Sequence, residues 1–220
     1  GTSIKESTNF VDQELLGSMN FTIQSEGDFK EIENVKLLDS LQKRIQNIEG
    51  LSNIKQSVSY ANIVRELYKE FNIYMDWYDM KSYPHDNNHL SEVIMFSEDS
   101  DDNVRTRLSN IINQDKSKTL IISQMQTVST EEASDIAKIV DSEISRFKND
   151  TKSNIVFKTT GLLIFLKDFV AMVVESSLIS IIASVFIIAI IMVVFFKRSY
   201  YACLSIIPLS TAIILNFGIM

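Results

Sequence analysis

The chain has few of the residues that build small catalytic and metal centres. Its 220 residues include one cysteine and two histidines. The single Cys203 can form neither an intrachain disulfide nor a cysteine-based zinc site. The sequence also contains no glycine-rich phosphate loop, no nucleophile elbow and no serine, histidine and aspartate set with hydrolytic spacing. We therefore expect a protein that is not an enzyme, with no catalytic residues, no metal and no cofactor.

Acidic residues are missing from the last part of the chain, where Glu175 is the final one. Two of the 21 basic residues, Lys197 and Arg198, are the only charges beyond it. The first 175 residues thus carry 19 basic against 28 acidic groups, a net charge of −9. A net negative charge opposes binding to a phosphate backbone, so we expect no nucleic-acid partner.

Two long uncharged runs fill the C-terminal part. At about 1.5 Å of helix rise per residue, the run from Ser176 to Phe196 matches a hydrocarbon layer of roughly 30 Å. The second run, Ser199 to Met220, is separated from it by the basic pair at 197–198. We predict a transmembrane hairpin, entered through a connecting helix at 162–175. The alternative is a buried helical hairpin in a soluble core, but such helices rarely contain so long an apolar run.

The basic turn predicts the orientation of this hairpin. Short loops that carry lysine and arginine tend to stay in the cytoplasm. The turn at 197–198 is therefore expected to be cytoplasmic, and the acidic domain extracytoplasmic or periplasmic. The chain would belong to a multi-pass protein of the inner or plasma membrane, with membrane lipids as partners.

The soluble part first shows the order strand, helix, strand. Residues Met19–Ser25 alternate apolar and polar residues, as a half-buried strand does. A helix predicted to end at Gly50 follows, and then a strand over Ile54–Tyr60 and a short helix over Ala61–Phe71. The apolar stripe of the first helix recurs at spacings of three and four: Val35, Leu38, Leu41, Ile45 and Ile48.

The same order then repeats. Thr119–Gln126 is predicted to be a strand, and Ser129 with Glu132 forms a capping box at a helix start. Asn154–Thr160 is predicted to be the last strand. The buried stripe of the second helix comprises Ala133, Ile136, Ala137, Val140, Ile144 and Phe147.

Two such halves predict a ferredoxin-like α+β domain, a four-stranded sheet with both helices on one face. The domain would span 19–161, after a lead-in at 1–18. An insertion at about 72–113 separates the halves, with short helices expected at Leu90–Phe96 and Asp102–Ile112.

The order of these elements resembles that of resistance-nodulation-division (RND) exporters, and among them the hydrophobe exporters related to the mycobacterial large membrane proteins (MMPL). The resemblance covers Phe10 to Met220. Its most specific motif is FKRSYYACLSIIPLSTAIILNFGIM at 196–220, with a basic turn, a mid-helix Ile-Pro and a closing FGIM. Softer motifs are LGSMNFTIQ, IEGLSNIKQSVS and KTTG.

The resemblance implies a periplasmic porter domain and the two transmembrane helices after it, in a transporter that exports lipids or other hydrophobic compounds. Its entry motif is more similar to that of the second half of such a transporter, and we expect the chain to stop within its last span. An ion gradient, typically of protons, would drive export through acidic residues on later helices. Neither apolar run contains Asp, Glu, His, Lys or Arg, so this segment cannot transduce the gradient. The implied partners are the remaining transmembrane helices, the hydrophobic substrate, and further subunits or accessory proteins.

A different class of function is also open, namely a membrane-anchored extracytoplasmic module that binds a protein and transports nothing. An extracytoplasmic enzyme is disfavoured, since no convergent nucleophile or metal set is visible in the sequence.

Candidate site residues fall in three groups. An aromatic and methionine cluster suits apolar ligands, a core contact or lipid headgroups: Tyr74, Met75, Trp77, Tyr78 and Met80. His85 and His89 would bring two imidazoles together on a helix, but Pro84 and the polar residues 86–88 favour a solvated loop, so we expect no metal there. Helix kinking or packing is expected at Pro208, Gly218, Ser180 and Ser184.

Overall fold

The computed structural model describes residues 2–15, 17–48, 51, 54–74, 83–98, 102–196 and 211. The chain divides into two compact units, Gly1–Lys167 and Asp168–Met220. The first unit contains a sheet and helices. The second contains most of one long helix.

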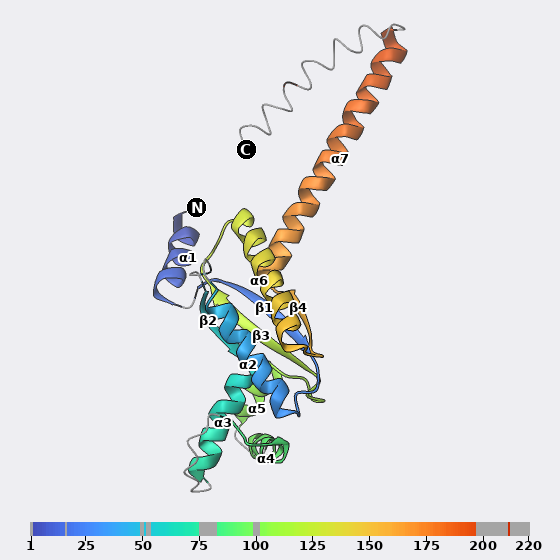
Figure 1. Cartoon of the computed structure of the whole chain (residues 1–220). Helices are drawn as coiled ribbons and strands as arrows, with labels where there is room; N and C mark the ends of the chain where they lie inside the picture. Colours follow the sequence, from blue (N-terminus) through green and yellow to red (C-terminus); the bar gives the residue numbers. More distant parts are fainter. Residues whose placement is uncertain are drawn as a thin grey trace. The chain divides into compact units, whose positions relative to one another are not determined.

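A four-stranded sheet in the order β2-β3-β1-β4 lies at the centre of the first unit (Figure 1). Its strands are β1 (Met19–Glu26), β2 (Ile54–Ser59), β3 (Lys118–Met125) and β4 (Val156–Thr160). All three neighbouring pairs are antiparallel. The edge strands β2 and β4 carry the exposed Lys55 and Lys158, which oppose pairing with another sheet.

The helices α2 (Ile32–Gln46) and α6 (Thr130–Thr151) follow β1 and β3 and cover one face of this sheet (Figure 1). Alternate side chains of β1 point into that layer and are buried: Met19, Phe21, Ile23 and Ser25. The predicted stripe of α6 is buried in full. Ser129 and Glu132 form the predicted capping box, with Ser129 Oγ accepting from the Glu132 amide at 3.2 Å. The mixed α+β class and the four-stranded sheet are thus confirmed.

Among the described residues, three helices lie between β2 and β3. Helix α3 spans Tyr60–Tyr74, α4 spans Asn87–Glu98 and α5 spans Asp102–Ser109. Helix α3 is longer than the predicted 61–71, and the two short helices of the insertion are confirmed with shifted ends. Phe71 and Phe96 join α3 to α4 edge to face, with ring centroids 5.7 Å apart.

Two helix ends differ from the predictions. Helix α2 ends at Gln46 instead of Gly50, because the backbone of Asn47 leaves the helical conformation, with φ of −103° and ψ of 11°. The lead-in contains a helix that the sequence did not predict, α1 (Thr2–Glu14). The Asp12 carboxylate holds its end by accepting from Ser18 N at 2.9 Å and Thr127 N at 3.1 Å.

Helix α7 runs without interruption from Leu162 to Phe196. Its first turn belongs to the domain, because Leu163 is a buried core residue. From Leu162 to Phe195 the helix is long and apolar enough to cross a membrane, and none of its most apolar window is buried. Among the described residues, α7 is thus the one helix with the length and composition of a membrane span. The second predicted span lies outside the described residues except for Thr211, so the hairpin stays a prediction.

Candidate functional site

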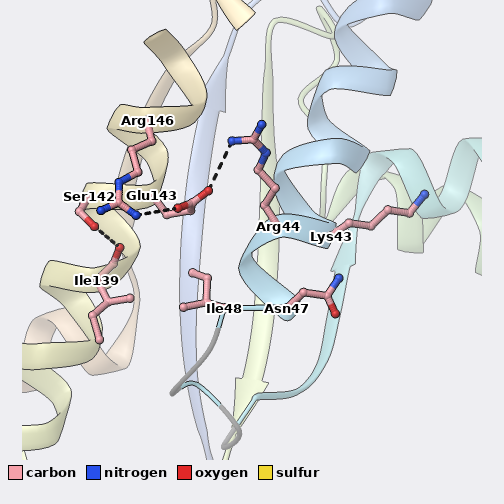
Figure 2. A pocket seen from close by; sticks show the side chains of 8 residues that line it. All are labelled: Lys43, Arg44, Asn47, Ile48, Ile139, Ser142, Glu143 and Arg146. Atoms are coloured by element: carbon pink, nitrogen blue, oxygen red, sulfur yellow. Dashed lines mark hydrogen bonds and ion pairs between the residues drawn. The ribbon is translucent and has the colours of Figure 1, made fainter. Parts of the chain in front are cut away.

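A groove of about 680 Å³ lies between the end of α2 and the middle of α6 (Figure 2). On one side it is lined by Lys43, Arg44, Asn47 and Ile48. The other side is lined by Ile139, Ser142, Glu143 and Arg146. Lys43 and Arg44 lie in the last turn of α2, and Asn47 and Ile48 directly follow that helix. The α6 residues lie beside the stripe that packs on the sheet.

Glu143 is the electrostatic centre of this groove. Its side chain is only 18% exposed and lies between two guanidinium groups, 3.5 Å from Arg44 and 3.8 Å from Arg146. Figure 2 shows Arg44 reaching across from α2 and Arg146 along α6 toward this carboxylate. The carboxylate therefore joins the two helices and fixes two cations at the groove.

Arg44 is held by two further contacts. Its guanidinium is 2.8 Å from Asp150 and 5.2 Å from the centre of the Phe147 ring. The hydrogen bond to Asp150 raises the pKa of Arg44 above its ordinary value, with Glu143 adding to the effect. Arg44 is therefore a permanently charged and positioned group.

The groove also has an apolar part. Ile48 is half-buried, whereas Ile139 is 37% exposed, although it lies on a helix whose other large apolar residues are buried. Ser142 Oγ donates to the backbone oxygen of Ile139 at 2.9 Å, so it is not poised beside a base. The lining can hold an apolar side chain next to anionic groups, and among the described residues it presents no nucleophile and base pair.

A second polar cluster, which we call the Asp39 network, joins α2 to α3 and to the segment after it. Asp39, with a side chain 8% exposed, pairs with Arg65 and also with Lys43, the latter at 2.6 Å. Arg65 donates to the Tyr83 hydroxyl at 2.8 Å and lies 5.2 Å from the centre of that ring. Burial raises the pKa of Tyr83 to about 12, against the opposing hydrogen bond from Arg65. The network attaches Tyr83 to α2 and α3.

Tyr83→Phe tests this network. At neutral pH the variant is expected to lose about 1 kcal/mol of stability, because Arg65 loses an acceptor. A raised pKa in the folded state means that the stability tied to neutral Tyr83 is fully present below pH 10 and is lost as the pH rises through about 12. The gap between wild type and variant should therefore narrow in alkali. Urea unfolding of the full chain in detergent, at neutral pH and between about pH 10 and 12, measures it. A gap that is the same at both pH values would show that Tyr83 does not titrate as described.

A third contact places α4 against the start of α2. Asn87 Oδ1 accepts from the Ile32 amide at 2.8 Å, and Asn87 Nδ2 donates to Glu31 at 2.7 Å. The Asn87 side chain thus satisfies one of the open amides of α2. The insertion is fixed to the domain by this contact as well as by the Asp39 network.

The two histidines lie at the start of α4. The Asp86 carboxylate accepts from the His89 amide at 2.9 Å, and the His89 ring nitrogen Nδ1 lies 2.9 Å from the same oxygen. The hydrogen bond from the amide, followed by that of the ring, lowers the pKa of Asp86. The prediction of a loop is wrong for His89, which lies in the first turn of α4 because Asp86 caps the helix. The imidazole rings of His85 and His89 are 5.6 Å apart. Within the described part of the chain, no group of three or more His, Cys, Asp or Glu residues could hold a metal ion.

The predicted aromatic cluster lies almost wholly outside the described residues. Tyr74 is the last residue of α3. Met75, Trp77, Tyr78 and Met80 are not among the residues that the structure describes, so contact of this cluster with an apolar ligand stays a prediction.

The predicted packing residues on α7 are placed more fully. Ser180 Oγ donates to Ser176 O at 2.9 Å, and Ser184 Oγ donates to Ser180 O at 2.8 Å. Their hydroxyls are therefore satisfied within the helix, and what they offer a neighbour is small size. A shallow groove of about 480 Å³ includes Ser176 and Ser180, whereas Pro208 and Gly218 lie outside the described residues.

Sequence reasoning missed the groove between α2 and α6. One signal for it was present, because Ile139 is apolar but out of phase with the buried stripe of α6. The pairing of Arg44 with Glu143 and Asp150 joins distant segments and had no signal in the sequence.

Comparisons with family models, curated proteins and solved structures return no match for this chain.

Proposed function

We propose that this chain is the extracytoplasmic porter domain and the following membrane segment of an RND-type transporter, which exports lipids or other hydrophobic compounds at the expense of an ion gradient. The observation that carries the proposal is the junction of domain and helix. Strand β4 ends at Thr160, and after Gly161 alone the chain enters α7, whose apolar side chains are exposed. A helix of this length and composition is suited to a membrane.

The topology of the domain also supports the proposal. The sheet order β2-β3-β1-β4, with α2 and α6 after β1 and β3, supports the ferredoxin-like sandwich that we propose for this domain. The helices α4 and α5 lie in the insertion between the two halves. A porter domain of the kind that the sequence motifs resemble would have this organisation.

The junction suggests how such a domain would work. Gly161 has φ of +104°, and a Cβ there would lie 3.0 Å from Thr22 N on the neighbouring strand β1. The turn is therefore tight, and a displacement of α7 would pass directly to β4 and β1. Residues 199–220 would return across the membrane, and later helices with buried acidic residues would supply the coupling.

The coupling can be tested in the full-length parent transporter. A flexible Gly-Ser linker inserted between Lys167 and Asp168 leaves the packed Leu163 in place but breaks the helix. We expect membrane insertion to persist and export of a fluorescent lipid to fall by about tenfold or more. The reason is that the proposed opening and closing of the domain requires a rigid connection between α7 and β4. The same linker between the exposed Gln114 and Asp115 is the matched control and should leave most export intact.

Unchanged export with the linker at Lys167 would overturn the mechanical coupling. The parent sequence gives a separate test, because a transporter must continue into several more membrane helices with at least one buried acidic residue. A parent without them would favour the alternative, a membrane-anchored module that binds a protein partner. The specific observation that favours this alternative is the charged groove between α2 and α6.

A further inference from the structure

We infer that a groove on α7 is the seat of the segment at 199–220, which packs antiparallel along one face of the helix in a fixed register. The inference rests on the proposed return of this segment across the membrane and deepens it, because it names the contact face and the facing residues. The groove has a volume of about 480 Å³ and is lined by Met172, Val173, Ser176, Ser177, Ser180 and Ile181.

One face of α7 is less exposed than the rest of the helix. Between residues 177 and 192 every position is exposed except five, which recur at spacings of four, four, four and three. This spacing follows the period of an α-helix, so the five half-buried residues form one stripe. The stripe begins inside the groove, and groove and stripe therefore make one contact face. Its residues are Ser177, Ile181, Val185, Ala189 and Met192.

The position of the basic turn selects the occupant and its register. Helix α7 ends at Phe196, and the second uncharged run begins three residues later. A helix that returns from so short a turn must lie beside α7 and run in the opposite direction. With the turn centred on 197–198, two facing residues lie equally far from it along the chain. Ser177 lies about 20 residues before the turn, and a return of the same length, about 30 Å of helix, ends at Gly218.

The side chains that this register brings together fit in size. Serine would face Val185, and isoleucine would face Ala189. Two small residues would meet at Ser177, where the backbones can approach closely, and two large ones would meet at Ile181. Because no hydrophobic effect draws helices together in a membrane, packing of this kind supplies the contact energy. From the groove to the turn, the facing residues are Gly218, Ile214, Ser210, Ile206 and Cys203.

The serine hydroxyls at the groove need no partner on the returning segment. Ser180 Oγ donates to Ser176 O at 2.9 Å, so it is satisfied within α7. An apolar helix can therefore lie against the groove without leaving this hydroxyl unpaired. The run at 199–220 contains no charged residue and meets this requirement.

Cysteine cross-linking of the full chain in cell membranes tests the register. All variants carry Cys203→Ser, so that only the introduced thiols react. In the first variant, Ser177→Cys and Gly218→Cys face one another closely enough for a disulfide. After mild oxidation, trypsin cuts at the basic turn 197–198 and separates the two helices. Mass spectrometry is expected to find their peptides linked at least about tenfold more often than in the control.

Ile179→Cys with Gly218→Cys is the matched control. Ile179 lies at nearly the same depth but about 200° further round α7, and its side chain is 61% exposed. Equal linkage in the two variants would overturn the inference. Val185→Cys with Ser210→Cys is a second pair that should link, because the same register brings these positions together. A disulfide between two copies, seen as a doubled mass on a non-reducing gel, would overturn the inference too, since a second copy would then occupy the groove.

Failure of this inference is distinguishable from failure of the proposed function. Flotation of the same membranes reports whether each variant lies in the lipid layer. A chain that floats but does not link would overturn the register and leave the transporter proposal standing. A chain that does not float would overturn both, because α7 would then not span the membrane.

Discussion

Replacing Ile187 and Ile190 together with arginine is expected to remove the chain from the membrane fraction. Both side chains lie on α7 and are about half exposed, at 56% and 49%. An arginine near the middle of a membrane span costs roughly 3 kcal/mol for insertion, and two of them on one helix cost roughly twice that. Flotation of cell membranes, with quantification of the full-length chain in the lipid layer, would show a loss of about a hundredfold or more.

The matched control places two arginines on exposed apolar residues of the domain. Ile73 is 79% exposed and Val156 is 41% exposed, so their replacement adds the same charge without entering a lipid phase. This control should float like the wild type. If the α7 variant also floats like the wild type, α7 does not span the membrane, and the proposed transporter fails with it.

The parts of the fold that the sequence predicted are those with local patterns. Strand β1 shows alternation, and α6 shows both a capping box and a regular stripe, so their existence and nearly their ends were predictable. Helix α1 has no such pattern, and it is fixed by contacts of Asp12 with Ser18 and with Thr127 at the end of β3. Contacts with a distant strand leave no trace in a local pattern.

Polar residues inside the domain were not predictable for a similar reason. Gln42 lies on the buried face of α2, where a stripe analysis expects an apolar residue. Its amide donates to Ser57 O at 2.8 Å and its oxygen accepts from Ser59 Oγ at 2.5 Å, both on β2. The partners satisfy each other only after α2 packs on the sheet, so the sequence shows the polar groups but not their pairing.

The candidate groove depends on the same kind of long-range pairing. Lys43 and Arg44 alone indicate favourable charges at a helix end. Glu143 alone indicates a surface position on α6. Only the packing of α2 beside α6 makes one carboxylate shared by two arginines, next to Ile139. A single sequence thus predicts the elements of the groove and not the groove.

Gly17→Ala is expected to destabilise the domain far more than Gly27→Ala. Gly17 has φ of +95°, and a Cβ there would overlap the carbonyl group of Met125 and lie 2.9 Å from Gln126 N at the end of β3. An L-residue with positive φ costs about 1–2 kcal/mol, and the backbone overlap must be relieved by moving β1 from β3, so we expect a loss of about 3 kcal/mol or more.

Gly27 is the matched position at the other end of β1. Its φ is not positive, and the nearest atom to an added Cβ is Ile155 Cγ1 at 3.1 Å, a side-chain atom that can rotate away. The loss there should stay below about 1 kcal/mol. Urea unfolding of both full-length variants in detergent measures the difference. Equal midpoints would show that the chain before β1 does not pass against the end of β3 as described, and the contacts of α1 through Asp12 would then lose their support.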